Sequence, residues 1–325
     1  SEMCIRDSIY YIKEVTAPKG YQVSDKIYYA TMDNAGETVN YIQGYVDTDG
    51  TQHPFDSSNP TGAIPNAKIT GTVSWTKVED GDAKFAPLAG SEWKLAKLGA
   101  DGSAEAQSWT VSDQSAPSGT TWKDIDPTPG KFTLEGLLPG TYRLVETQAP
   151  LGYNLNTAVY KFTVSNEDGS TTWTEDKKPT FDEGGNAYIS DSLATTSVTI
   201  PVTKSVRNTD WPKDDKGSYV PFEFSIEATG DYAAKAPEPK EPKISVAPEA
   251  GETDAAKLNN ITAAFGTMTF NKSHLSDTAG TAGDYAKTYT YTVKEVAPTT
   301  GTIDKFRYSK AEYQVAVTVK AYMDK

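Results

Sequence analysis

Residues 142–153 read YRLVETQAPLGY, and this stretch decides how the rest of the chain is interpreted. The pattern returns at residues 10–21 as YYIKEVTAPKGY and, more weakly, at residues 289–298 as YTYTVKEVAP. Each copy alternates apolar and polar residues and then stops at Ala-Pro, where proline ends strand pairing and begins a turn. Chance recurrence of Glu-x-x-Ala-Pro-x-Gly-Tyr is improbable, so the chain contains an internal repeat built on a β-strand.

Two further elements recur around this glutamate strand. A lysine strand precedes it, as GTVSWTKV at residues 71–78 and as SVTIPVTKSV at residues 197–206. A closing strand follows it, as GAIPN at residues 62–66 and AYISD at residues 187–191. The order lysine strand, glutamate strand and closing strand therefore defines one repeating unit.

This order predicts three domains. Residues 1–69 would be a unit that lacks its first strands, and residues 1–8 show no alternation and look foreign to it. Residues 70–196 would be a complete unit, and residues 197–325 a unit without its last strand. Short linkers predict an elongated array, and the Pro- and Glu-rich segment 233–254 is expected to be a long exposed loop.

The composition agrees with an all-β surface protein. The chain has 325 residues, is rich in tyrosine, glycine and proline, and contains no apolar stretch long enough for a membrane span. Its net charge of −13 argues against nucleic acid or an anionic membrane as partner. The single cysteine, Cys4, excludes an internal disulfide.

Strand parity places ionisable residues among apolar ones, because alternate side chains of a strand share a face. Lys77 shares a face with Val73 and Trp75, and Asp191 with Ala187 and Ile189. The same parity puts five more polar residues on apolar faces: Glu146, Glu14, Asn66, Lys204 and Glu295. A lone buried ammonium group is strongly unfavourable, so this repetition calls for a chemical explanation.

Two explanations are open at this point. The first is a buried salt bridge from each lysine to a carboxylate, although such pairs stabilise poorly because desolvation offsets the attraction. The second is covalent. Burial favours the neutral forms of amines and carboxylic acids, so a neutral Lys77 amine could attack the side-chain carbonyl of Asp191 while Glu146 transfers protons. With Asn66 as acceptor, ammonia would leave instead of water.

The middle unit resembles the collagen-adhesin B-type domains of Gram-positive surface proteins and SpaA-like pilins. The resemblance rests on Trp-Thr-Lys77, on LLPGTY at residues 137–142, on residues 142–153 and on Tyr-Ile-Ser-Asp191. It implies tandem Ig-like or transthyretin-like β-sandwiches, with Lys77 and Asp191 joined by an isopeptide bond and Glu146 as the catalytic acid. Residues 9–66 resemble the back half of such a domain, with Glu14 and Asn66 in matching places.

The third unit resembles the related major-pilin domain through Lys204, PFEFSI at residues 221–226 and Glu295. That resemblance implies an acceptor on a final strand that we expect to be missing, which leaves Lys204 unreacted. It also implies a chain outside a Gram-positive cell, in a pilus or anchored to the wall, joined by sortase to neighbouring subunits.

Two functional classes follow. The chain is expected to be a structural stalk or pilus subunit whose only chemistry is its own crosslinking. The alternative is an adhesin that binds a host or matrix ligand through loops such as 33–61 and 233–254, or a spacer of a large surface enzyme. No cofactor or metal is expected, since His53 and His274 lack neighbours at ligand spacing and Asp47 to Gly50 is an incomplete calcium loop.

Overall fold

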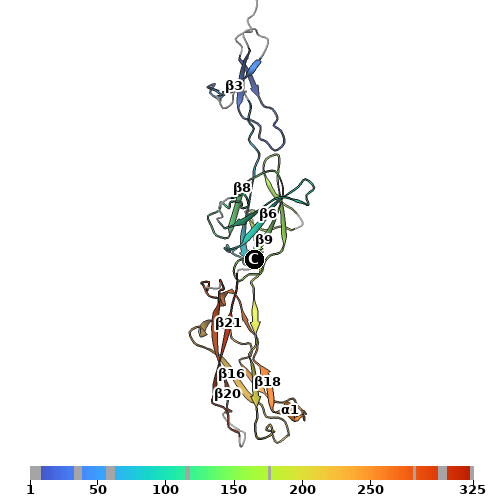
Figure 1. Ribbon diagram of the computed structural model, residues 1–325, viewed down its shortest axis with the longest axis vertical. Helices are drawn as coiled ribbons and strands as arrows, with labels where there is room; N and C mark the ends of the chain where they lie inside the picture. Colours follow the sequence, from blue (N-terminus) through green and yellow to red (C-terminus); the bar gives the residue numbers. More distant parts are fainter. Residues whose placement is uncertain are drawn as a thin grey trace, which may run out of the picture. The chain divides into compact units, whose positions relative to one another are not determined.

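The structure is a computed structural model that describes residues 9–32, 39–55, 63–113, 118–174, 177–280, 283–298 and 306–322. Strands dominate these residues, and the helices among them are short (Figure 1). The one α-helix of the described part, α1, spans Ala255–Leu258. None of the helices described is long and apolar enough to cross a membrane. The predicted all-β class is confirmed.

The chain separates into two compact units. The first comprises Ser1–Val78, Ala83–Thr147 and Asn156–Ile189, and the second comprises Glu79–Asp82, Gln148–Leu155 and Ser190–Lys325. Two hydrophobic cores accompany this division, one built from residues between Val73 and Ile189 and one from residues between Ile200 and Val319. The finer division at residues 69 and 196 stays a prediction.

The first strands form an antiparallel sheet of order β1-β2-β3-β4. Its strands are β1 (Ile9–Lys13), β2 (Ile27–Met32), β3 (Val39–Val46) and β4 (Gln52–Pro54). Tyr10 and Ile12 have the same parity as Glu14 and form the apolar face expected beside it, but this face is not buried, because every residue of β1 is exposed. The segment 33–61, expected to be a loop, contains β3 and β4, while its two ends lie outside the described residues.

The expected closing strand of this part is also absent. Residues 63–67 belong to no strand, and only Lys68 forms an isolated bridge, to Tyr21. Pro65 lacks an N–H group and interrupts any ladder there, so Asn66 reaches its place from irregular backbone.

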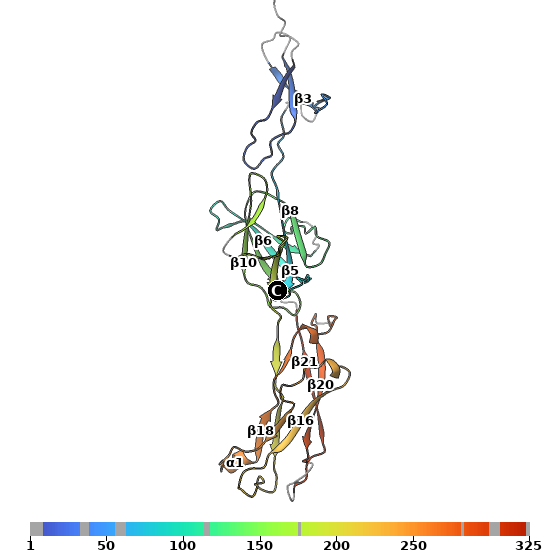
Figure 2. The ribbon, with the colours of Figure 1, turned by 180° about the vertical axis from the view of Figure 1, so that it is seen from behind.

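Two sheets enclose the next core, with orders β11-β10-β9-β6-β7 and β12-β13-β5-β8 (Figure 2). Their strands are β5 (Gly71–Glu79), β6 (Glu92–Leu98), β7 (Glu105–Ser112), β8 (Lys131–Leu137), β9 (Gly140–Gln148), β10 (Val159–Val164), β11 (Thr171–Trp173), β12 (Thr180–Phe181) and β13 (Ala187–Asp191). Trp75 lies at the centre of the core, stacked on Phe132 at 4.9 Å and edge-on to Trp93 at 5.5 Å.

The predicted parity of β5 and β9 is confirmed. Val73, Trp75 and Lys77 are buried while Thr72 and Ser74 are exposed, although the opposite-face residues Thr76 and Val78 at the end of β5 are buried as well. Tyr142, Leu144 and Glu146 are buried in the same way on β9. The regular alternation therefore places the ionisable residues inside the sandwich.

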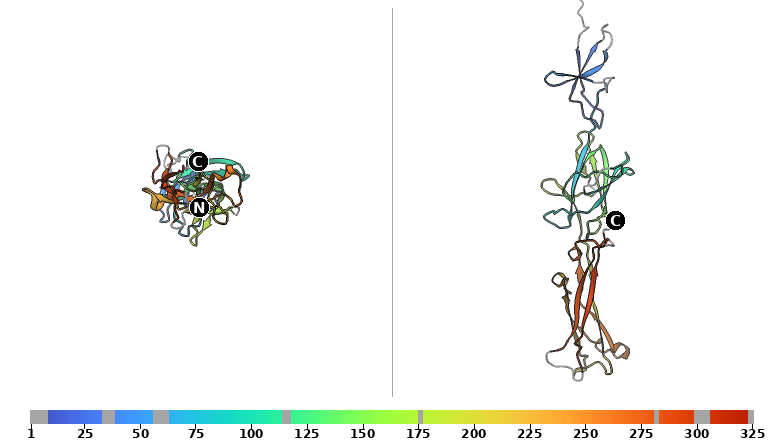
Figure 3. Two further views of the ribbon diagram at one scale, coloured as in Figure 1. Left: turned by 90° about the horizontal axis from the view of Figure 1, so that it is seen from below. Right: turned by 60° about the vertical axis from the view of Figure 1, so that its left-hand side comes forward.

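The second unit contains two short pairs and one larger sheet, of order β17-β16-β20-β21. The pairs are β14 (Thr196–Val198) with β19 (Met268–Phe270) and β15 (Pro201–Ser205) with β18 (Asn260–Ala264). The larger sheet comprises β16 (Phe222–Thr229), β17 (Lys243–Val246), β20 (Lys287–Val296) and β21 (Glu312–Val319). Figure 3 shows β20 and β21 as a long orange and red hairpin.

The prediction of a long exposed loop at 233–254 is wrong. Its middle forms β17, which pairs with β16 and buries Ile244 and Val246 in the second core. The surrounding proline, glutamate and lysine residues hid a short alternating segment, because local composition says little about a four-residue strand.

Candidate functional site

Lys77 and Glu146 form a fully buried pair. Lys77 lies on β5 and Glu146 on β9, and the lysine Nζ is 2.9 Å from Glu146 Oε1. Neither side chain has any exposed surface. The Trp93 ring lies 5.1 Å from the same Nζ, so the amine is enclosed by aromatic and aliphatic groups. Removal from water makes the charged state of both groups expensive.

The second oxygen of Glu146 is held by the main chain. Asn156, ten residues later, donates its backbone N–H to Oε2 at 2.9 Å. Because Oε2 accepts this bond, a neutral Glu146 carries its proton on Oε1, the oxygen that faces Lys77. The carboxyl group is thus oriented for proton transfer at one atom.

Asp191 is the last residue of β13 and is also buried. Its main-chain carbonyl accepts the N–H of Asp80 at 2.8 Å. β13 is the neighbour of β5 in the sheet, and Asp80 follows Lys77 by three residues. The ends of these two strands are therefore held together by backbone pairing.

The Pro-x-Gly-Tyr turn after β9 binds the chain that leaves Asp191. Asn154 donates to the Ser192 carbonyl at 3.0 Å, and Ala194 donates to the Gly152 carbonyl at 2.9 Å. Gly152 has a φ of +81°, and a Cβ there would lie 2.7 Å from the Cβ of Lys272. Glycine is thus required both by the backbone angle and by this close approach.

Residues 9–69 at the N-terminal side repeat this arrangement with different residues. Gln22 donates to the Ala67 carbonyl at 2.8 Å, and Ile69 donates to the Gly20 carbonyl at 2.8 Å. The residue just before Ala67 is Asn66, as Asp191 is the residue just before Ser192. Relative to its own turn, Asn66 therefore takes the place that Asp191 takes.

Asn66 and Glu14 are in contact. The Asn66 Nδ2 lies 2.9 and 2.7 Å from the two carboxylate oxygens of Glu14. Ser24, ten residues after Glu14, donates its backbone N–H to Oε2 at 2.7 Å. Like Glu146, this glutamate accepts a backbone N–H on Oε2, and its side-chain partner here is the amide of Asn66.

Lys204 and Glu295 form a third such pair, with Nζ 2.6 Å from Oε1. The backbone N–H of Ser309 donates to Oε2 at 2.8 Å, and the Phe222 ring lies 4.2 Å from the amine. Here the lysine side chain is 15% exposed and borders a groove of about 490 Å³. The contacts are the same as those of Lys77 and Glu146, but the lysine is less completely buried.

The structure brings together Lys77 with Glu146, Glu14 with Asn66, and Lys204 with Glu295. The motifs gave no sign of the backbone N–H groups that hold each glutamate, since any residue can supply one. A weak signal exists in the spacing, because Ser24 and Asn156 both follow their glutamate by ten residues.

Two signals that were set aside are explained by local contacts. His53 stacks on Tyr45, and the His274 ring nitrogen accepts the backbone N–H of Asn271. Within the described ranges, no group of three or more His, Cys, Asp or Glu residues is arranged to hold a metal.

Two family matches cover most of the chain. Residues 71–178 match the family described as SpaA: Prealbumin-like fold domain. Residues 200–324 match the family described as FctA: Spy0128-like isopeptide containing domain. A search of curated proteins gave no match.

Several solved structures are similar at low identity. The Bacillus anthracis TIE protein is 16% identical, with a TM-score of 0.42 over 98% of this chain, which spans only 39% of that protein. A C-terminal fragment of the pilus adhesin SpaC from Lactobacillus rhamnosus GG is 15% identical, with a TM-score of 0.29 over 75% of this chain and 82% of that one.

The full-length major pilin SpaD from Corynebacterium diphtheriae is 15% identical, with a TM-score of 0.27 over 78% of this chain and 67% of its own. Because each of these TM-scores lies below 0.5, the assignment rests on the two family matches. The chain therefore contains a SpaA-family prealbumin-like domain at residues 71–178 and a Spy0128-like isopeptide-containing domain at residues 200–324.

Proposed function

We propose that the chain is a structural subunit of a Gram-positive pilus or surface stalk, and that its prealbumin-like domain closes a self-formed isopeptide bond between Lys77 and Asp191. The observation that carries this proposal is the pair of Lys77 and Glu146, fully enclosed and 2.9 Å apart. A buried ion pair alone would be a poor stabiliser, because the desolvation of two charges offsets their attraction. Two Lys–Glu pairs and one Asn–Glu pair, each with a backbone N–H on the glutamate, favour a chemical role instead.

The reaction balances without an external reagent. The neutral Lys77 Nζ attacks Cγ of the protonated Asp191 side chain, and a carbon–nitrogen bond forms. Glu146 donates its Oε1 proton to the carbonyl oxygen under attack and takes a proton from the amine nitrogen. Glu146 then protonates one hydroxyl of the intermediate, whose C–O bond breaks so that water leaves, and it regains a proton from the remaining hydroxyl as the amide carbonyl forms. Holding the groups together in a closed core supplies the rate.

The outer copies are assigned matching roles. Asn66 is the proposed acceptor beside the acid Glu14, where attack by a lysine amine would release ammonia. Lys204 is the proposed nucleophile beside Glu295, with its acceptor expected on a strand that enters the groove at this pair. The groove of about 490 Å³ beside the buried Glu295 supports that assignment.

The proposal also covers location and partners. The matches to the SpaA prealbumin-like and Spy0128-like isopeptide families support an extracellular position. Neighbouring subunits, or the cell wall through sortase, are the proposed partners. The chain would not turn over any external substrate.

Intact mass spectrometry of the full chain tests the crosslink. The measured mass should be one water below the sequence mass, and tandem spectra should identify a linked peptide containing Lys77 and Asp191. Lys77→Met should abolish the water loss, and Glu146→Gln should largely do so because proton transfer is lost.

Lys94→Met is the matched control, because Lys94 also pairs with a glutamate, Glu105 at 2.8 Å, but on the surface. This variant should keep the water loss. A wild-type chain at full mass would reduce the Lys77 site to an ordinary buried ion pair.

A further inference from the structure

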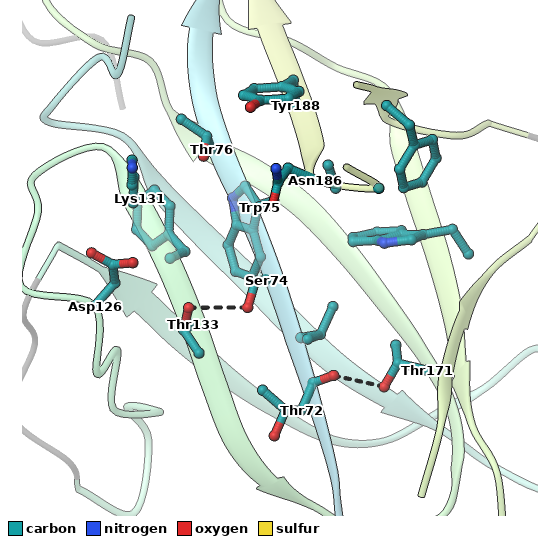
Figure 4. Close-up of a pocket in the computed structure, with 16 residues that line it drawn as sticks. Thr72, Ser74, Trp75, Thr76, Asp126, Lys131, Thr133, Thr171, Asn186 and Tyr188 are labelled. Atoms are coloured by element: carbon teal, nitrogen blue, oxygen red, sulfur yellow. Dashed lines mark hydrogen bonds between the residues drawn. The ribbon is translucent and has the colours of Figure 1, made fainter. Parts of the chain in front are cut away.

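A groove of about 500 Å³ lies on the outer face of the sheet β12-β13-β5-β8 (Figure 4). Lys77, Glu146 and Asp191 do not line it, so the crosslinking chemistry does not use it. The volume falls within the usual range of small-ligand sites, about 300–1,000 Å³. Besides the core residues Trp75 and Phe132, its lining combines hydroxyl groups, the aromatic residues Trp173, Phe181 and Tyr188, and one charge of each sign.

The floor of the groove is polar and uncharged. Ser74 of β5 and Thr133 of β8 lie side by side, with their hydroxyl oxygens 3.0 Å apart. At one end the Thr171 hydroxyl donates to the Thr72 carbonyl at 2.8 Å, and both contacts are dashed in Figure 4. Hydroxyl groups both donate and accept hydrogen bonds, so this surface matches a ligand that also carries hydroxyl groups.

Aromatic rings supply the apolar part of the lining. Phe181, on the two-residue strand β12, is 44% exposed. Trp173 is half-buried, and its ring packs edge-on against Phe162 at 5.2 Å, which fixes its orientation. An exposed phenylalanine beside a held tryptophan offers a flat apolar surface at the side of a polar floor.

The charged groups disfavour a strongly charged ligand. Asp126 and Lys131 both line the groove, and because their charges are of opposite sign, the lining has no net charge. Asp126 is oriented by the Thr128 N–H, which donates to its Oδ1 at 2.8 Å. The net charge of −13 further disfavours a polyanion such as a nucleic acid.

The position of the groove also disfavours an extended peptide. Peptides commonly bind a sheet by adding a strand to a free edge. The floor strand β5 has a neighbour on each side, β13 and β8, so no strand can be added to it. Two edge strands that also line the groove, β11 and β12, are only three and two residues long and offer little backbone for a peptide to pair with. A wholly apolar ligand would leave the hydroxyl floor without partners.

From this combination we infer that the groove binds a neutral oligosaccharide. Sugar rings present C–H faces that pack on aromatic rings and hydroxyl groups that exchange hydrogen bonds with threonine, serine and carboxylate groups. Phe181 and Trp173 would bind the ring faces, while Ser74, Thr133 and Asp126 would bind the hydroxyl groups. The domain would then attach the surface structure to glycans as well as extend it.

Saturation-transfer NMR and calorimetry on the full chain test this inference. The probes are the hexasaccharides of cellulose, amylose and chitin, together with N-acetyllactosamine. At least one should bind with a dissociation constant below about 1 mM. Phe181→Ala should weaken that binding about tenfold through the loss of ring packing. Asp126→Asn should weaken it by a smaller factor.

Tyr232→Ala is the matched control, because Tyr232 is 46% exposed but lies on the second unit. It should leave binding unchanged. Trp173→Phe keeps an aromatic ring against Phe162 and separates loss of stacking from loss of folding. Failure of all four probes to bind at about 10 mM would overturn the inference, as would binding that Phe181→Ala and Asp126→Asn leave unaltered.

Discussion

The two lysine–glutamate pairs make the same contacts but differ in how completely they are buried. Lys77 and Glu146 lie 2.9 Å apart, and Lys204 and Glu295 lie 2.6 Å apart, each with a backbone N–H on the second carboxylate oxygen. The Lys77 side chain has no exposed surface, whereas that of Lys204 is 15% exposed and borders a groove.

The difference follows from the neighbouring strands. β5 lies between β13 and β8, whereas β15 pairs with β18 in a two-stranded sheet of the described residues. The lysine strand and the glutamate strand alone are therefore enough to form the pair. In the proposed reaction, a further strand beside the lysine strand would exclude water from the pair and would also supply the acceptor.

The largest expected effect is the difference in the free energy of unfolding between replacing Lys77 and replacing Lys204. Lys77→Met should lower the free energy of unfolding by about 4–5 kcal/mol, the magnitude of a crosslink that closes a loop of roughly one hundred residues. Lys204→Met should lower it by about 1–3 kcal/mol, because Glu295 keeps its backbone N–H and the groove admits water. Differential scanning calorimetry of both variants measures the contrast, and equal losses would refute it.

A smaller effect compares two equivalent glycines. Gly20 and Gly152 have φ values of +84° and +81°, but only Gly152 closely approaches a neighbour, Lys272. Gly20→Ala should cost about 1 kcal/mol for its backbone angle. Gly152→Ala should cost about 2–3 kcal/mol, because Lys272 must also move. Urea unfolding of the two variants gives the comparison, and equal midpoints would show that the approach to Lys272 is unimportant.

The smallest effect appears only in alkaline solution and should be alike in both domains. Burial raises the pKa of Tyr142 and of Tyr291 to about 12. Above pH 10 these phenols ionise in the unfolded chain while they stay neutral in the folded one. The contribution of these phenols to the free energy of unfolding is therefore fully present below about pH 10 and is lost as the pH rises towards 12.

Urea midpoints measured across this pH range should fall, and either Tyr142→Phe or Tyr291→Phe should make the fall shallower. The two substitutions should act to a similar extent, unlike those of the lysines. A flat profile in the wild-type chain would contradict the buried, neutral state of these phenols.

Much of the fold and of the site could be predicted from periodicity. The alternation around Lys77 and Glu146 correctly placed both residues inside the sandwich. The same alternation in β1 does not lead to burial, because Tyr10 and Ile12 are exposed. Alternation shows that two residues share a face, but burial also requires a second layer on that face.

The remaining features depend on groups that have no sequence signature. The backbone N–H of Asn156 that orients Glu146 would be present with almost any side chain. The groove on the outer sheet depends on Phe181 and Ser74, which are far apart in the chain and ordinary in their local context. Such features appear only once strands from distant segments pair.

The backbone bond from Asn156 to Glu146 has a consequence for timing. Lys77, Glu146 and Asn156 come from separate segments, and the proton-bearing oxygen is oriented only when all three are in place. An unfolded chain therefore cannot carry out the proposed reaction, and a misfolded one would stay unlinked. Once formed, the amide would not reverse on unfolding. The crosslink would then be found in every chain whose domain had folded correctly at least once, even after that chain had unfolded.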